Sequence, residues 1–258
     1  NTSYTHNFLV FYWTNISKTQ GEAMYIVRHQ CFAQKKHRAP VLEPVQAEGG
    51  VNIPTDGYLR QVREWCDDQG LLLIYDEVQT GMGGTGKMWA YEHYGVKPDL
   101  LAFGKKMQVC GMMGGERITD NEDNVFSTST RINSTFGGNL VDMVRGAACL
   151  EVIVEEDLLD NATKVGEDLL KGLNELGERH DIITNVRGKG LFAAFTLPDR
   201  ANRDAFRMQA LDYGVFALNS GFDSIRLRPC LNLTHEEADE ALSIFEQTTK
   251  CIESLQVA

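Results

Sequence analysis

Apolar residues in the first half of the chain follow the periodicities of strands and helices. Residues 71–75 are an unbroken apolar run, which is typical of a parallel strand that is covered on both faces. Before this run, apolar residues recur at helical spacing over 58–66, and Pro54 suits a first helical position while Gly70 suits a helix end. A second apolar run at 100–103 predicts the next strand.

The segment between these two strands contains a glycine-rich loop at 81–86 and a short predicted helix at 89–94. A strand, a helix and a strand in this order predict a right-handed crossover between adjacent parallel strands. We therefore expect an α/β fold with an open and mostly parallel sheet in this part of the chain.

The second half of the chain has a different pattern, with long helices around short strands. Thr234 and Glu237 have the spacing of a capping box at the start of the last helix. The expected elements are helices from 138 to 153, over 155–179, over 203–213 and from 234, and strands over 182–186, 191–197, 215–218 and 224–227. This pattern predicts a small α+β domain at the C-terminus.

The changes in pattern divide the chain into three segments. Residues 1–40 combine polar turns, several aromatic residues and a helical stretch over 21–36, and they carry no recognisable chemistry. We expect residues 41–150 to form part of a large domain and residues 151–258 to form the small C-terminal domain.

Composition and charge narrow the classes of function. Of 258 residues, 43% are hydrophobic and 24% are charged, which is typical of a folded soluble chain. The net charge of −11 argues against an electrostatic nucleic-acid binder or a binder of anionic membranes. The longest early apolar run, at 8–13, is too short to span a membrane, and no secretory signal is evident.

The cysteines and histidines give no metal or disulfide signature. Six cysteines occur without a Cys-x-x-Cys pair, so we expect scattered core thiols in a reducing cytoplasm. The six histidines have no metal-ligand spacing, and no bound metal is expected.

Two residues with strong chemical character follow the predicted parallel strands. Asp76 follows the run 71–75, and Lys105 follows the run 100–103, so one crossover should bring the two together at the carboxyl edge of the sheet. A carboxylate that pairs with a ring N–H, beside a lysine that can form an imine, fits pyridoxal phosphate. The structural alternative is that Asp76 caps a turn and that Lys105 is simply solvated.

A phosphate-binding loop is a second alternative for this region. The segment from Gly81 to Lys87 nearly matches the phosphate loop of nucleotide hydrolases, and the run ending in Asp76 resembles their magnesium-binding strand. Met88 stands where that loop requires a hydroxyl, and the two elements are contiguous rather than on separate strands. Both facts argue against nucleotide binding.

Several motifs together resemble those of the class III aminotransferases, which are pyridoxal-phosphate enzymes of fold type I. The motifs are EPVQAEGG at 43–50, DEVQTG at 76–81, FGKKMQVCG at 103–111, NSTFGGN at 133–139 and IRLRP at 225–229. The resemblance runs from about residue 41 to the C-terminus. Within the family, the motifs at 103–111, 133–139 and 225–229 are most similar to those of the members that act on L-lysine.

The resemblance implies a role for each cofactor residue. Lys105, rather than the adjacent Lys106, would bind the aldehyde of pyridoxal 5′-phosphate and later move a proton, because adjacent extended residues face opposite ways. Asp76 would keep the pyridine nitrogen protonated, Val78 would pack on the ring, and Gln79 would hydrogen-bond the phenolic oxygen.

Thr135 is expected to reach the cofactor phosphate of a neighbouring subunit. The resemblance therefore also implies a homodimer.

The resemblance further implies transfer of the terminal amino group of L-lysine to 2-oxoglutarate, with Glu48, Arg228 and Asn133 as substrate-binding residues. Glu48 would pair with Arg228 and swing away when the oxoacid arrives. Other terminal-amino donors, 4-aminobutyrate or ornithine, stay open, and Arg228 has a structural ion pair as its alternative.

The sequence departs from the family pattern in two places. Residues 1–40 hold neither the phosphate cradle nor the stacking ring that the family has before the EPVQAEGG motif, so a non-catalytic remnant that binds a partner subunit is the second hypothesis. Ala47 stands where the family usually has glycine, which requires a negative φ at this position.

Overall fold

The computed structural model describes residues 39–128, 131 and 138–257, so the predicted helix at 21–36 lies outside the described residues. The described chain falls into two units that interleave along the sequence. The first holds residues 39–44, 54–79 and 90–150 apart from the gaps, and the second holds residues 45–53, 80–89 and 151–257. The predicted division at residue 150 stays a proposal.

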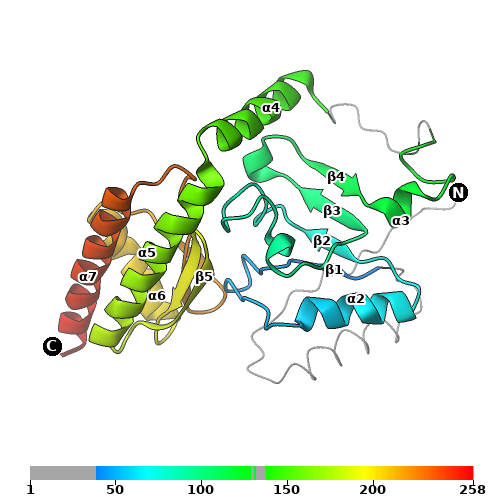
Figure 1. Cartoon of the computed structure of the whole chain (residues 1–258). Coiled ribbons are helices and arrows are strands. Elements are labelled where there is room, and N and C mark those ends of the chain that lie inside the picture. The colour runs from blue at the N-terminus through cyan, green and yellow to red at the C-terminus, as the bar shows by residue number, and fades with distance from the viewer. Residues whose placement is uncertain (1–38, 129–130, 132–137, 258) are drawn as a thin grey trace, which may run out of the picture. The chain divides into compact units, whose positions relative to one another are not determined.

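The first unit is built on a four-stranded sheet in the order β1-β2-β3-β4 (Figure 1). The strands are β1 (Val41–Leu42), β2 (Ile74–Asp76), β3 (Leu100–Phe103) and β4 (Gly111–Gly114). The first three are parallel and β4 is antiparallel to β3. The predicted open and mostly parallel sheet is confirmed, and the run at 100–103 forms β3 as expected.

Helix α2 (Tyr58–Asp68) supplies most of the core beside this sheet. Its buried residues Leu59, Val62 and Trp65 pack with Tyr75 of β2, and Gly70 follows the helix with φ +66°, as its predicted role in ending the helix requires. Pro54 is not its first residue, because the helix begins only after Gly57, whose φ of +85° lies outside helical backbone. Burial raises the pKa of Tyr58 to about 12.

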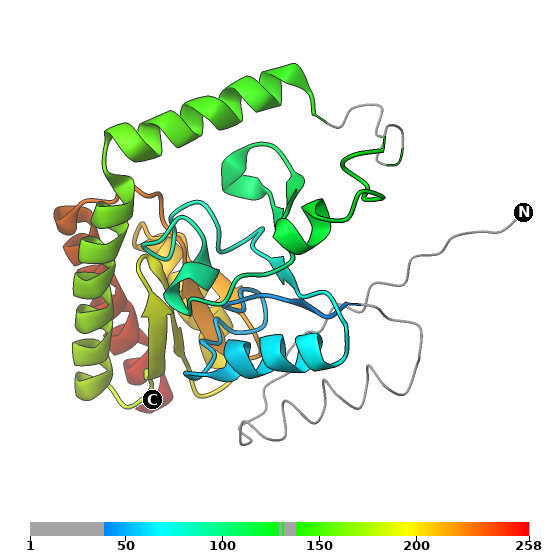
Figure 2. The ribbon, with the colours of Figure 1, turned by 45° about the vertical axis from the view of Figure 1, so that its right-hand side comes forward.

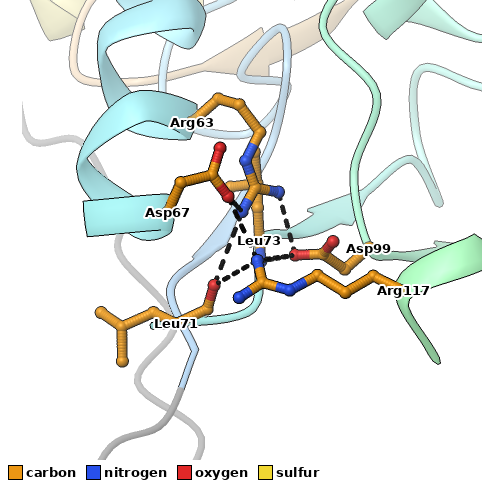
Figure 3. Close-up of polar contacts among 6 residues, drawn as sticks. All are labelled: Arg63, Asp67, Leu71, Leu73, Asp99 and Arg117. Atoms are coloured by element: carbon orange, nitrogen blue, oxygen red, sulfur yellow. Dashed lines mark hydrogen bonds and ion pairs between the residues drawn. The ribbon is translucent and has the colours of Figure 1, made fainter. Parts of the chain in front are cut away.

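The predicted strand at 71–75 is wrong at its start, since β2 begins at Ile74. Asp99, with a side chain only 8% exposed, explains the difference, because its Oδ2 accepts the N–H of Leu73 at 2.6 Å. The same oxygen lies 2.9 Å from Nη1 of Arg63 and 3.6 Å from Nη1 of Arg117 (Figure 3). Asp99 therefore ties together the chain just before β2 and β3.

The remaining elements of the first unit are short. They are η1 (Ala90–His93), η2 (Lys105–Met107) and α3 (Glu116–Thr119), and the sequence pattern predicted only the first of these, as a short helix. Helix α4 (Leu140–Glu155) crosses the boundary between the units and matches its predicted range closely.

The second unit is an antiparallel sheet with helices on one face. Its strands lie in the order β5-β6-β8-β7, and α5, α6 and α7 pack beside them (Figure 2). The bounds are β5 (Thr184–Lys189), β6 (Phe192–Thr196), β7 (Leu218–Ser220), β8 (Ser224–Leu227), α5 (Leu158–Arg179), α6 (Arg200–Asp212) and α7 (His235–Val257). The α+β character expected of this region is confirmed, although the strand predicted at 215–218 begins only at its last residue.

Three phenylalanines from three elements meet in the core of the second unit. Phe195 of β6 has its ring centroid 5.3 Å from that of Phe206 and 5.9 Å from that of Phe245, both in edge-to-face geometry. The predicted capping box of α7 is confirmed, since Glu237 N donates to Thr234 Oγ1 at 3.2 Å and Thr234 N to Glu237 Oε2 at 2.9 Å.

The cysteines that the structure describes are all free, but only Cys66 is buried. The expectation of core thiols is therefore wrong for Cys110 and Cys230, which are exposed. Cys31 lies outside the described residues. No helix within residues 39–128 and 138–257 is both long and apolar enough to cross a membrane.

We predict that Asp99→Asn lowers the free energy of unfolding by about 3 kcal/mol, because it leaves the partly buried Arg63 without its main counter-charge. The pKa of Arg63 follows the same logic: burial lowers it, but the hydrogen bonds to Asp99 and Asp67 outweigh burial and leave it raised. Urea unfolding followed by circular dichroism measures the change.

The matched control is Asp67→Asn, which removes the exposed carboxylate from the same cluster and should cost about 1 kcal/mol or less. Equal losses for Asp99→Asn and Asp67→Asn would contradict the role given to Asp99.

Candidate functional site

Asp76 is the last residue of β2 and lies at the carboxyl edge of the first unit's sheet. Parallel pairing places Asp76 opposite Ala102 of β3, three residues before Lys105. Asp76 is half-buried, and its Oδ1 accepts the N–H of Val78 at 3.0 Å. The two residues that the sequence singled out for chemistry therefore lie at the carboxyl ends of neighbouring parallel strands, Asp76 as the last residue of β2 and Lys105 two residues after β3.

Lys105 begins η2 with a backbone φ of +50°, a conformation that costs a residue with a side chain some free energy. Its side chain is exposed and makes no hydrogen bond or ion pair with the described residues. Lys106 is half-buried. The two lysines differ in exposure, but they lie in a 3₁₀ turn rather than in the extended backbone that we predicted, so the choice of Lys105 over Lys106 stays a prediction.

Val78 and Gln79 follow Asp76 in the same unit. Val78 is half-buried, and a Cβ added to Gly104 would lie 3.6 Å from its Cγ1, so Val78 packs beside the residue that precedes Lys105. Gln79 is buried. Thr135 and Asn133, which the sequence also indicated, lie outside the described residues.

Sequence reasoning overlooked Glu77, which fixes the chain after β2. Its side chain is 1% exposed, and its carboxylate accepts the N–H groups of Ala90 at 2.7 Å and Tyr91 at 2.8 Å. Glu77 thereby caps η1 and holds the chain next to Asp76. Glu77 and Ala90 are 13 positions apart in the sequence, so no local pattern indicated this cap.

A second set of functional residues lies on the sheet of the second unit. Ile225 of β8 faces the core of this unit, so Arg226 faces the other side of the sheet by alternation. Residues 45–53 hydrogen-bond to β5 and to the β7–β8 hairpin. This segment contains Glu48, the acidic residue that the sequence indicated.

Glu48 pairs with Arg226, through Oε1 and Nη1 at 3.0 Å. The side chain of Arg226 is 4% exposed, whereas that of Glu48 is 59% exposed. The predicted partner was Arg228, which lies just past the end of β8 and is half-buried. Our prediction of the partner is thus corrected, because Arg226 lies inside the strand and Arg228 follows it.

Arg228 nevertheless lies within electrostatic reach of the pair. Burial lowers the pKa of its guanidinium, the charge of Arg226 lowers it further, and the charge of Glu48 opposes both. Two arginines and one carboxylate in one unit form a site with a net positive charge, which suits the binding of a second carboxylate.

The glycine-rich loop at 81–86 packs against its own unit rather than forming an open anion cradle. A Cβ on Gly83 would lie 2.9 Å from Leu159 Cδ2, and one on Gly86 would lie 2.4 Å from Thr163 Oγ1. The loop leads to the 3₁₀ turn η1 instead of to the long helix that a phosphate-binding loop requires. These contacts account for Gly83 and Gly86 without a nucleotide.

Ala47 is not among the described residues with positive φ, so its side chain is tolerated where the family has glycine. In the described part of the chain, no three His, Cys, Asp or Glu side chains are grouped so that they could hold a metal ion.

Comparison with known proteins gives consistent matches. The profile of the class-III aminotransferases matches residues 17–249. The L-lysine-epsilon aminotransferase of Amycolatopsis lactamdurans is 48% identical over 202 residues, which are 78% of this chain and 45% of that protein. The enzyme of the same name from Streptomyces clavuligerus is 42% identical over 214 residues, 82% of this chain and 47% of that protein.

A solved structure of the lysine aminotransferase from Mycobacterium tuberculosis matches with a TM-score of 0.87 and 40% identity, over 90% of this chain and 54% of that one. This likeness confirms the predicted fold type. The chain spans about half the length of the relatives that it matches.

Proposed function

Because the chain belongs to the class-III aminotransferase family, we propose that it carries residues for transfer of the ε-amino group of L-lysine to 2-oxoglutarate. The observation that carries the proposal is that Asp76 and Lys105 lie at the carboxyl ends of adjacent parallel strands, at one edge of a sheet. The names of the relatives support L-lysine as the donor.

The donor set at this edge fits pyridoxal 5′-phosphate. It offers a half-buried carboxylate and an exposed primary amine, and the amine forms no ion pair with the described residues. When bound, pyridoxal phosphate supplies an aldehyde that condenses with amines and a ring that accepts electron density from the reacting carbon.

Each residue at the edge has a distinct role in this proposal. Lys105 Nζ would hold the aldehyde group of the cofactor and would move the proton that leaves the amine-bearing carbon of the substrate. The carboxylate of Asp76 keeps a proton on the pyridine nitrogen, and its hydrogen bond from Val78 N fixes its orientation. Val78 supplies an apolar contact for the ring, and Gln79 hydrogen-bonds the phenolic oxygen.

Glu48 and Arg226 address a difference between the two substrates. L-lysine, reacting through its ε-amine, has no carboxylate at the reacting carbon, whereas 2-oxoglutarate has one beside its keto carbon. With Glu48 on Arg226, the positive charge is masked for L-lysine; with Glu48 turned away, Arg226 binds the carboxylate of 2-oxoglutarate. We assign this exchange to Arg226 rather than to Arg228.

The proposal also covers the oligomeric state, one more substrate-binding residue and the location of the protein. The protein acts as a homodimer in which Thr135 reaches the cofactor phosphate of the neighbouring subunit, and Asn133 contributes to substrate binding. Its location is the cytoplasm, where pyridoxal phosphate and both substrates occur in solution.

We predict that borohydride reduction of the protein with pyridoxal phosphate labels Lys105, because its amine is exposed and lies at the same edge as Asp76. Peptide mapping by mass spectrometry identifies the labelled lysine. Lys105→Ala should lose the label, and the adjacent control Lys106→Ala should keep it. Labelling at Lys106, or no labelling of either lysine, would contradict the proposed cofactor site.

We predict that Arg226→Gln weakens 2-oxoglutarate binding by about 30-fold, since truncating one partner of a buried charge pair costs about 2 kcal/mol or more. Arg228→Gln is the matched control and should change the affinity for 2-oxoglutarate about threefold or less. Arg228 lies just past the end of β8, and we expect its charge to attract the ligand only weakly. Isothermal titration measures both affinities, and the reverse order would assign the site to Arg228.

A further inference from the structure

The backbone around Glu48 is held at four successive carbonyl groups, all within the second unit. The carbonyl of Gly49 accepts the side-chain amide of Asn52 at 3.1 Å. The carbonyl of Glu48 accepts Gly221 N at 2.8 Å, and that of Ala47 accepts Ser220 Oγ at 2.6 Å. The fourth carbonyl, that of Gly50, accepts the guanidinium of Arg187 through Nε at 2.9 Å and also through Nη2.

Arg187 fixes more than this one carbonyl. Its Nη1 donates to the carbonyl of Asn185 at 2.7 Å and to Thr196 Oγ1 at 3.0 Å, and its Nη2 donates to Ser224 Oγ at 2.9 Å. One rigid planar group thus joins β5, β6 and β8 to the segment that contains Glu48. Two of its three nitrogens converge on Gly50 O, two residues after Glu48.

The acceptors of Arg187 among the described residues are all neutral oxygens. Burial lowers the pKa of Arg187, and the charge of Asp223 only partly opposes this. Burying part of a guanidinium without an ion pair costs free energy. We therefore attribute the role of Arg187 to its planar set of hydrogen-bond donors rather than to its charge.

The side chain of Glu48 contrasts with its backbone. Its carboxylate is mostly exposed, and its ion-pair partner Arg226 is buried. With the carbonyls of residues 47–50 held, turning the carboxylate away from Arg226 requires rotation of the side chain alone. The loop then keeps the same position in both states.

We propose that Arg187 is a positioning residue that holds Gly50 and thereby sets Glu48 where its carboxylate masks Arg226. The inference rests on the proposed function, because it assigns Arg187 the task of placing the acidic half of that exchange. Without the two bonds to Gly50 O, the loop moves and Glu48 masks Arg226 for a smaller fraction of the time. A carboxylate ligand then binds more tightly, and discrimination between the two substrates falls.

The test uses glutarate, which has the two carboxylates of 2-oxoglutarate but no keto group and does not react. Isothermal titration compares wild type, Glu48→Ala, Arg187→Gln and the double variant. If Glu48 masks Arg226 for most of the time, Glu48→Ala tightens glutarate binding about tenfold, and Arg187→Gln tightens it about threefold or more. The double variant binds no more tightly than Glu48→Ala, because Arg187 acts only through Glu48.

Two controls separate positioning from a general loss of structure. Arg179→Gln removes a positive charge from the same unit, where Arg179 pairs with Glu246 on α7, and should leave glutarate affinity unchanged. Arg187→Lys keeps the charge but not the planar pair of donors, and it should shift affinity in the same direction as Arg187→Gln. If Arg187→Gln fails to fold by circular dichroism, Arg187→Lys takes its place in the comparison.

The outcomes distinguish this inference from the proposed function. If Glu48→Ala tightens binding and the Arg187 variants do not, or if their effects add fully, the role of Arg187 is wrong. If wild type and Glu48→Ala bind glutarate no better than Arg226→Gln, the proposed carboxylate site itself is wrong.

Discussion

A guanidinium on the face of a sheet, with only 4% of its side chain exposed, is the constraint on which the second unit depends. Removing the charge of Arg226 from water costs several kcal/mol unless an anion lies close to it. Ile225 and Leu227 face the helices, so the anion must come from the opposite side of the sheet. Residues 45–53 supply it, and their bonds to Ser220 and Arg187 hold the segment that carries Glu48.

Because the side chain of Glu48 is exposed, the ion pair between Glu48 and Arg226 can open. A carboxylate that remains mostly in water loses little when it leaves, and a substrate carboxylate can take its place without leaving Arg226 uncompensated. A fully buried partner would make the pair permanent. In the function we propose, this difference in exposure would allow one site to serve a substrate with a carboxylate and a substrate without one.

In the first unit, a structural ion pair and the candidate cofactor residues lie at opposite ends of the parallel strands. Before β2 and β3, the buried carboxylate of Asp99 accepts a hydrogen bond from Leu73 N and pairs with Arg63. At their carboxyl ends, the carboxylate of Asp76 accepts the N–H of Val78, and Lys105 is exposed and has a positive φ. Asp99 and the pair Asp76 and Lys105 thus differ in how completely their side chains are hydrogen-bonded, and we propose the cofactor site at the end with Asp76 and Lys105.

Local signals in the sequence predicted the features that depend on neighbouring residues alone. The strand at 100–103, the helix end at Gly70 and the capping box at Thr234 each occur as expected. The start of β2 could not be predicted, because it depends on Asp99, 26 residues from Leu73.

The partner of Glu48 was missed for a similar reason. Arg226 and Arg228 have the same parity on the strand and so face the same side in an extended chain. Only the pairing of β8 with β6, which places Arg226 opposite Ala194 and leaves Arg228 past the strand end, distinguishes them. The motif identified the right segment, and tertiary structure identified the residue.

The most direct test of the central claim is a crystal structure of the protein with glutarate bound. The account predicts one glutarate carboxylate on the guanidinium of Arg226, the Glu48 side chain rotated away, and the backbone of residues 46–52 in its present hydrogen bonds. A glutarate carboxylate on Arg228, with Glu48 still paired to Arg226, would contradict it.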